Sequence, residues 1–285
     1  MIPWFVKISV KLVLSRLPIS RPFLNRIGIF RHGSMVEPDY AWEIFERHLK
    51  LAGVRLQGKS VLELGPGDSV GNGIIAFAMG AERSVLIDAG DWASKSLEGY
   101  RRFVDWLCDH LPEQDRLKSA RRDWATFEDM LSTYRISYLT EGLGSMRKLP
   151  ADCIDYCFSE AVLEHVRVDD FSETMRQLRR IVIDGAVGSH VIDYKDHLQL
   201  GLNNMRFSRR VWESDCFTRS GFYTNRLRHP DIVDAFRAAG FDVVSDQPVL
   251  WDALPPSACG IHPELRRYTA DELRIREASI VVRPR

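Results

Sequence analysis

The stretch SVLELGPGDSVG, residues 60–71, organises the rest of the sequence. Its first half is a short apolar run, typical of a buried parallel strand, and its second half is rich in glycine. Glycine has no side chain to hold a ligand away from the backbone, so the stretch predicts a strand that opens into a nucleotide-like binding turn. Glu63 precedes the glycines, and its carboxylate suits a cationic or hydroxyl-bearing ligand better than the phosphates that a dinucleotide fold places there.

A second apolar run, SVLID at residues 84–88, ends in an acid as well. The distance from Glu63 to Asp88 along the chain is that of neighbouring strands joined by one helix, so Asp88 is expected at the tip of the adjacent strand. A carboxylate in that place can accept hydrogen bonds from both hydroxyls of a ribose. The alternative is that Asp88 only caps a helix.

A third stretch, LPADCIDYCFSEAVLEHV at residues 149–166, makes the pattern specific. With ELGPG at 63–67 it resembles the class I S-adenosylmethionine-dependent methyltransferases. ELGPG resembles their first motif, and LP, a spacer and D-x-x-x-S-x-x-x-L-E-H-V resemble the fourth-strand motif of the members that act on small molecules. The resemblance implies an α/β, Rossmann-like, seven-stranded fold over residues 37–285, mostly parallel with the last strand antiparallel.

The resemblance also implies a set of residues that bind S-adenosylmethionine. They are Glu63, Gly65, Pro66, Gly67, Asp88, Ala89, Ser145, Met146, Ser159 and Glu160. Gly65 and Gly67 are expected to let the backbone approach the methionyl part of the cofactor. Glu63 is expected to help hold its ammonium end, and Asp88 to bind the ribose.

Two further segments complete the implied cofactor site. The loop at residues 144–146 is expected to border the adenine, within a longer loop over 141–150. Ser159 and Glu160, at the end of the fourth strand, are expected to line the cavity around the transferred methyl group. Glu164 and His165 are expected to open the helix that follows.

Methyl transfer from a sulfonium is an in-line displacement at an activated carbon, so the protein mainly aligns the reactants and excludes water. A hydroxyl or protonated amine acceptor also needs a base within hydrogen-bond reach. His197 is the first candidate, with Asp193 or Asp196 to orient it, and His165 is the second. The alternative for His197 is a hydrogen bond to the lid or to solvent.

The sequence predicts no metal site. Some related methyltransferases bind a metal through E-x-x-E-H and a later histidine. Here Ala161 stands at the first position of that pattern, and Glu160 is one residue out of phase. Packing and hydrogen bonding at the start of a helix are sufficient to explain Glu164 and His165.

The first 36 residues form a basic extension. Six lysines and arginines precede the first acid, Glu37. Residues 4–17 have the pattern of an amphipathic helix, which can either lie on a membrane surface through residues 1–20 or pack on its own domain as a strap. The helix expected over residues 40–51 adds Arg31, His32 and Tyr40 as possible ligand contacts.

A segment rich in arginine, asparagine and aromatic residues, 198–228, interrupts the alternation of strands and helices. It predicts a lid or acceptor pocket after the fifth strand. Together with the basic extension, it favours a polar, glycan-like or lipid-linked small molecule as the methyl acceptor.

Composition bounds the remaining function classes. The chain has 285 residues, of which 45% are hydrophobic and 27% charged, with a formal net charge of zero. These values favour one folded domain and disfavour a nucleic-acid surface. Five cysteines without a CxxC pair fit a reducing cytoplasm.

Two competing functions stay open. A nicotinamide-dependent oxidoreductase could use the glycine turn and Asp88, but it explains neither Glu63 nor the LEH sequence at 163–165. A catalytically silent protein that binds the cofactor or a partner is the other alternative.

Overall fold

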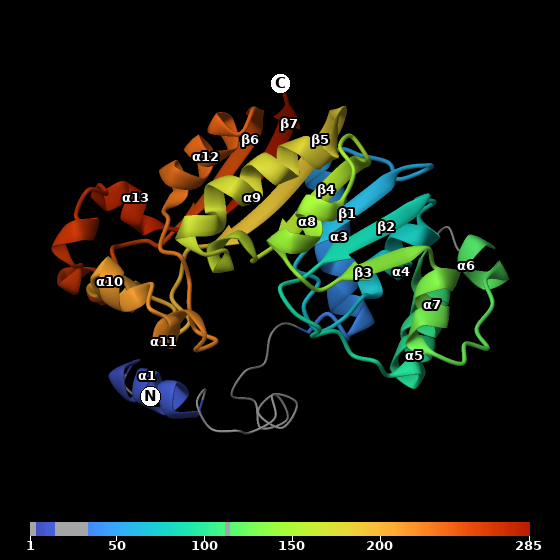
Figure 1. Cartoon of the computed structure of the whole chain (residues 1–285), viewed down its shortest axis with the longest axis horizontal. Helices are drawn as coiled ribbons and strands as arrows, with labels where there is room; N and C mark the ends of the chain where they lie inside the picture. Colours follow the sequence, from blue (N-terminus) through green and yellow to red (C-terminus); the bar gives the residue numbers. More distant parts are fainter. Residues whose placement is uncertain (1–3, 15–33, 112–114) are drawn as a thin grey trace.

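The computed structural model describes residues 4–14, 34–111 and 115–285 (Figure 1). Two of the possible ligand contacts named above, Arg31 and His32, lie outside these ranges, as does most of the basic extension.

In the described part of the chain the strands form one seven-stranded sheet. They are β1 (Ser60–Leu64), β2 (Arg83–Ile87), β3 (Ile136–Leu139), β4 (Ile154–Glu160), β5 (Val182–Asp193), β6 (Phe241–Leu250) and β7 (Ile275–Pro284), and their spatial order is β3-β2-β1-β4-β5-β7-β6. Strands β1 to β5 pair in parallel, and β7 runs antiparallel to both β5 and β6. The predicted fold class, with its antiparallel last strand, is confirmed.

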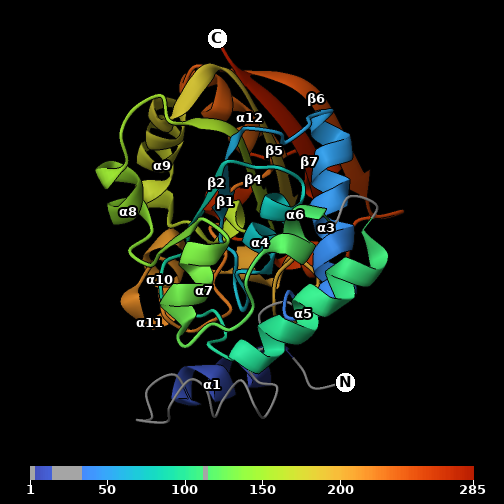
Figure 2. The same cartoon turned by 90° about the vertical axis from the view of Figure 1, so that its right-hand side faces the viewer.

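Helices cover both faces of the sheet (Figure 2). They are α1 (Trp4–Leu14), α3 (Pro38–Ala52), α4 (Gly71–Ala78), α5 (Leu97–His110), α6 (Asp115–Ser119), α7 (Phe127–Thr133), α8 (Leu143–Lys148), α9 (Val168–Ile181), α10 (Arg209–Trp212), α11 (Asp215–Thr218), α12 (His229–Ala238) and α13 (Ala270–Arg274). Short 3-10 turns are η1 (Leu163–His165), η2 (Asn203–Arg206), η3 (Pro256–Gly260) and η4 (Pro263–Leu265).

The alternation of side chains along β1 decides which core each residue joins. Val61 packs into the core under α3, α4 and α5, whereas Leu62 and Leu64 pack into the core under α9 and α12. Successive strand residues point to opposite faces, so Glu63 lies on the same face as Val61. This places its carboxyl group under α4 instead of above the sheet edge.

The structure differs from the sequence-based expectations in two segments near the site. The expected loop over 141–150 contains helix α8, and η1 separates β4 from α9, which begins only at Val168. Glu164 and His165 therefore lie in a short turn of their own and do not open the following helix. Ala161, with φ +51°, makes the sharp bend after β4 that leads into this turn.

Helix α1 packs against the segment that we interpreted as a lid. Ile8 is buried in a cluster with Leu198, Trp212 and other lid residues, and Nζ of Lys7 donates a 2.8 Å hydrogen bond to the carbonyl of Leu198. This is the arrangement that the strap alternative expects. Among the described residues, no helix combines the length and the apolar character needed to cross a membrane.

Candidate functional site

The glycine turn after β1 has one packed side and one open side. Gly65, with φ +69°, donates its amide to the carbonyl of Ile87 at 2.8 Å, and a Cβ atom there would lie 2.4 Å from a methyl of Val162. Gly67 has nearly the same conformation, φ +68°, but a Cβ atom there would meet no atom of the described residues within 4 Å. Gly65 is therefore needed for packing against the turn after β4, and Gly67 leaves an open surface for a ligand. Pro66 is buried between them.

Asp88 lies beside this turn at the end of β2. Its Oδ2 accepts a 3.1 Å hydrogen bond from the amide of Gly67, and its Oδ1 accepts one of 2.7 Å from the amide of Ala89. Burial raises the pKa of Asp88, and the backbone amide of Gly67 opposes that rise. The backbone amide of Gly90 and the side chain of Trp92 also hydrogen-bond to this carboxylate.

The segment expected to border the adenine lies next to Asp88. The amide of Gly142 donates to the carbonyl of Asp88 at 2.7 Å, which ties the start of α8 to the end of β2. Ser145 is buried, with Oγ accepting from the amide of Glu141 at 3.1 Å, and Met146 is buried in the core on the α9 side. The side chains of Ser145 and Met146 thus stabilise this segment from the protein interior.

Glu63 is the most unusual group in the glycine turn. Its side chain is 2% exposed, and Oε1 accepts a 2.6 Å hydrogen bond from Nδ2 of Asn72 in the first turn of α4. Within the described ranges, Oε2 has no hydrogen-bond partner. Burial raises the pKa of Glu63 to about 8. An added positive charge nearby would favour its ionised form.

These features fit S-adenosylmethionine as the bound group. The open side of Gly67 admits a ligand against the backbone, the carboxylate of Asp88 lies beside it, and one oxygen of the buried carboxyl group of Glu63 has no partner in the described part of the chain. A cofactor with a ribose and an ammonium group matches this set of groups.

Ser159 and Glu160 lie on opposite faces of the sheet, as neighbours in a strand must. Ser159 is completely buried, and its Oγ is 2.8 Å from Nδ1 of His190. Glu160 points toward α3, where it pairs with Arg47 and His48. That both residues line the methyl cavity stays a prediction, since their contacts here are with α3 and with the interior of the sheet.

The contacts of Glu160 continue into a buried chain of polar side chains. His48 Nε2 is 3.1 Å from Glu160, His48 Nδ1 is 2.7 Å from Oγ of Ser189, and that hydroxyl is 2.9 Å from the hydroxyl of Tyr156. Burial alone would raise the pKa of Glu160, but the hydrogen bonds from His48 and Arg47 outweigh it and hold that pKa below its usual value. This chain of side chains fixes α3 to β4 and β5.

The η1 turn is held by the lid. The side-chain amide of Asn225 donates to the carbonyls of Leu163 and Val166 at 2.8 and 3.0 Å, and its backbone amide donates to the carbonyl of Glu164 at 2.6 Å. His165 Nδ1 lies 2.8 Å from the carbonyl of Tyr223. A carbonyl only accepts, so Nδ1 carries the proton and the lone pair of neutral His165 is on Nε2.

The two histidine candidates for a base lie together. The rings of His165 and His197 are 4.9 Å apart between centroids, in an edge-to-face arrangement. The acids proposed to orient His197 have firm partners of their own. Asp193 accepts from the amide and the ammonium of Lys195, at 2.8 and 3.0 Å, and Asp196 accepts from the backbone amides of Leu198 and Gln199.

No metal centre is found in the described ranges, where three or more His, Cys, Asp or Glu side chains nowhere gather closely enough to hold an ion. The absence of a metal therefore stays a prediction from the sequence.

Several residues of this site were missed in the sequence. Asn72 could have been found, because it stands in the first turn of the helix that follows the glycines. Arg47, His48, Tyr223 and Asn225 had no comparable signal, since their partners lie far away along the chain.

Comparisons with known proteins found no matching family model and no matching curated protein. Solved structures do match, at low sequence identity. A Burkholderia thailandensis 1,6-didemethyltoxoflavin methyltransferase, with 1,6-didemethyltoxoflavin and S-adenosylhomocysteine bound, is 12% identical over 94% of this chain and 92% of its own, with a TM-score of 0.45. A Haemonchus contortus phosphoethanolamine N-methyltransferase is 13% identical over 85% of this chain and 52% of its own, with a TM-score of 0.48. An arsenic(III) S-adenosylmethionine methyltransferase from Chlamydomonas reinhardtii is 16% identical over 81% of this chain and 64% of its own, with a TM-score of 0.44.

Because these TM-scores lie below 0.5, the fold is assigned from the strand order of the chain itself. That order, with β7 antiparallel between β5 and β6, is the order of the class I methyltransferase fold. A fold alone does not define a function, which is argued from the site.

Proposed function

We propose that this protein is an S-adenosylmethionine-dependent methyltransferase that acts on an oxygen or nitrogen nucleophile of a small molecule. The observation that carries the proposal is the hydrogen bond from the amide of Gly67 to the carboxylate of Asp88. It joins the two sequence motifs expected to bind the methionyl and ribose parts of one ligand.

In this proposal Gly67, Asp88 and Glu63 hold the cofactor, which supplies a methyl group on a sulfonium. The remaining task of the protein is to align the acceptor and exclude water. His165 is suited to take the proton of the acceptor, because its Nε2 lone pair is set by the hydrogen bond from Nδ1 to the lid. His197, in ring contact with it, is the alternative base.

The finer acceptor class is also a proposal. A polar acceptor, glycan-like or lipid-linked, is supported by the number of polar lid residues that are buried near η1, among them Asn204, Thr224 and Asn225. Membrane contact by residues 1–20 has narrower support, since Phe5 and Val6 are exposed on α1 while the ammonium of Lys7 is bonded to the lid.

The test is methyl transfer from a methyl-labelled cofactor to fractions of a small-molecule extract. We expect label in at least one fraction, loss of that label in the Asp88→Ala variant, and at least a tenfold lower rate in His165→Ala with unchanged cofactor affinity. Binding of S-adenosylmethionine without transfer to any fraction would contradict the enzyme and favour the silent cofactor-binding protein.

A further inference from the structure

The loop after β2 folds over the carboxylate that we propose as the acceptor for the ribose. Asp88 accepts hydrogen bonds from the backbone amides of Gly67, Ala89 and Gly90 and from the side chain of Trp92. A carboxylate offers about four acceptor positions, and these four donors fill them. The two hydroxyls of a ribose can therefore bind to Asp88 only if at least one donor moves away.

Three of the four donors are backbone amides, and other contacts hold the loop in place. The carbonyl of Asp88 accepts from the amide of Gly142, at the start of α8, at 2.7 Å. The carbonyl of Gly90 accepts a 3.2 Å hydrogen bond from the hydroxyl of Tyr138 on β3. The amides of the loop can leave the carboxylate only if the loop also leaves β3 and α8.

The fourth donor, Trp92, is a side chain on the surface. Trp92 is 43% exposed, and its indole Nε1–H is the one donor that its side chain has. Its backbone amide is anchored, because it donates a 3.0 Å hydrogen bond to the hydroxyl of Tyr138. The indole can therefore turn about its side-chain torsions while the loop stays in place.

The loop has room for the indole because of Gly90. A Cβ atom at Gly90 would lie 2.4 Å from Cζ2 and 3.0 Å from Nε1 of Trp92, so the indole lies directly against the glycine. The backbone of Gly90 is outside the left-handed region. An alanine there would displace the indole without forcing a positive φ on the main chain.

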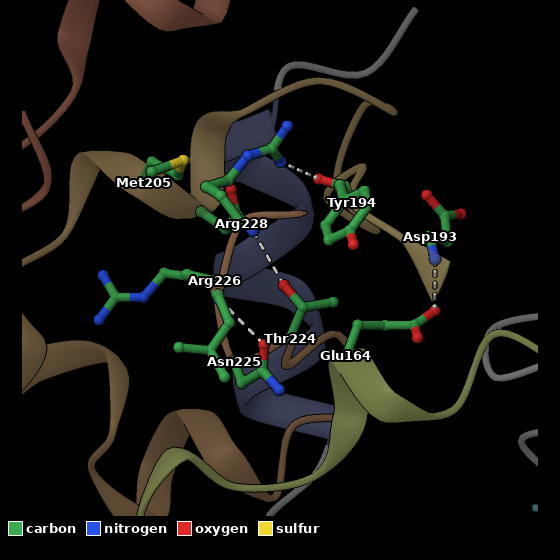
Figure 3. A pocket seen from close by; sticks show the side chains of 10 residues that line it. Glu164, Asp193, Tyr194, Met205, Thr224, Asn225, Arg226 and Arg228 are labelled. Carbon is green, nitrogen blue, oxygen red and sulfur yellow. Dashed lines mark hydrogen bonds between the residues drawn. The ribbon is translucent and has the colours of Figure 1, made fainter. Parts of the chain in front are cut away.

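The lid side of the site does not compete for the nucleoside at the pocket between η1, the end of β5 and the lid (Figure 3). There Glu164 accepts from the backbone amide of Asp193 at 3.4 Å, and Arg228 donates to the carbonyl of Tyr194 at 2.9 Å. Glu164 and Arg228 are at most 3% exposed, and the space has room for roughly one water molecule. A nucleoside is far larger than this pocket.

Resting on the proposed cofactor, we propose that the indole of Trp92 is a gate on the ribose position, hydrogen-bonded to Asp88 when closed and turned outward when S-adenosylmethionine binds. The gate sets the affinity for the cofactor and takes no part in the transfer. Each ligand whose ribose binds to Asp88 has to break the same contact, so S-adenosylmethionine and its demethylated product should be weakened by the same factor. A tryptophan that only stacked on the adenine would do the opposite, since its ring would add affinity.

The test is calorimetry with S-adenosylmethionine on the full-length protein. Trp92→Phe keeps an aromatic ring but removes the donor, and Gly90→Ala keeps the donor but displaces the indole. We expect each variant to bind S-adenosylmethionine at least threefold more tightly than wild type. Trp106→Phe, on α5, is the control and should leave the affinity unchanged, since Trp106 is stacked on His110 with the ring centroids 4.2 Å apart. Unchanged or weaker binding in Trp92→Phe would overturn the gate.

A second measurement follows the indole itself. NMR measures the exchange of its N–H hydrogen with solvent, and the signal of Trp92 is the one that is missing in Trp92→Phe. We expect exchange at least threefold faster in Asp88→Ala, which removes the acceptor, and in wild type after saturation with S-adenosylmethionine. Asp91→Ala should leave it unchanged, because that carboxylate is exposed and paired with Lys95. Equal exchange in wild type and Asp88→Ala, both without cofactor, would also overturn the gate.

Failure of the gate is distinguishable from failure of the proposed function. Binding of S-adenosylmethionine with equal affinity in wild type and Trp92→Phe would overturn the gate and leave the proposed methyltransferase intact. A slowly exchanging indole hydrogen in a protein that binds no S-adenosylmethionine, with or without the Trp92→Phe change, would overturn the proposed function.

Discussion

At the scale of single residues, the buried carboxyl group of Glu63 makes the stability of the fold depend on pH. The folded protein holds this carboxyl group buried, with a pKa of about 8, whereas the unfolded chain has a value near 4.5. The folded state therefore binds more protons between these values, and stability contributed by neutral Glu63 is lost as pH rises from 4.5 toward 8.

Replacing Glu63 with glutamine should remove this loss, because the amide cannot ionise. Relative to wild type, the free energy of unfolding of Glu63→Gln should rise with pH, by on the order of 2–3 kcal/mol between pH 4.5 and 7. Urea unfolding at several pH values measures it, with Glu82→Gln as the exposed control. A difference that does not change with pH would show that Glu63 is ionised when buried. The same variant should bind S-adenosylmethionine at least tenfold more weakly.

Gly67 can be tested with a control matched in backbone conformation. Gly67→Ala and Gly53→Ala each force alanine into a left-handed conformation, at φ +68° and +61°, with no atom of the described residues within 4 Å of the new Cβ. Each should lose about 1 kcal/mol of stability. Only Gly67→Ala should weaken cofactor binding, tenfold or more, as measured by calorimetry. Equal cofactor affinity in the two variants would remove Gly67 from the site.

At the scale of elements, α3 is fixed to the sheet by the Glu160 chain. Glu160→Gln removes the charge that Arg47 and His48 share and should cost about 1–3 kcal/mol of stability at neutral pH. The control is Glu46→Gln, which removes an exposed ion pair with Lys50 on the same helix and should cost at most about 0.5 kcal/mol.

The difference in stability between Glu160→Gln and Glu46→Gln should shrink as pH falls. The pKa of Glu160 is held below its usual value, so the stability from its charge is full above the unfolded value and is lost as pH falls through the folded one. Chemical unfolding at neutral and acidic pH measures this. Equal effects of the two substitutions would mean that α3 is held by its apolar face alone.

The sequence predicted the strands and helices that have a distinctive local pattern. Strands β1, β2 and β4 are short apolar runs at the expected spacing, and all were found. Helix α8 was missed because it has only six residues, with Gly142 and Gly144 at its start, and these indicate a loop. The exposed half of strand β6, through Leu250, has no apolar alternation that would indicate a strand in the sequence, and it is held by pairing with β7.

The candidate site, like the fold, was predictable where its residues belong to local motifs. Glu63, the glycines and Asp88 belong to local motifs, and the structure brings them together. The partners that decide the state of each acid are not local. Arg47 meets Glu160 across more than a hundred residues of chain, and Asn225 reaches η1 from the lid, so neither could be assigned without the packed sheet.

At the scale of the whole molecule, α1 and the lid form one packed unit beside η1. Ile8→Ala should loosen this unit by about 2 kcal/mol, because it removes a buried side chain from the cluster with Leu198 and Trp212. Faster amide hydrogen exchange should appear in residues 198–228 and not in β1 or β4. Val6→Ala, on the exposed side of the same helix, is the control. Unchanged exchange in the lid would show that α1 does not support it.

The central claim, that the glycine turn and Asp88 hold S-adenosylmethionine, is tested most directly by calorimetry on the full-length protein. Titrations with S-adenosylmethionine and with NAD should show one site for the first and no binding of the second. The affinity for S-adenosylmethionine should fall at least tenfold in Asp88→Asn and stay unchanged in Asp91→Asn, whose carboxylate is exposed and paired with Lys95. Binding of NAD without S-adenosylmethionine, or equal affinities in the two variants, would contradict this account.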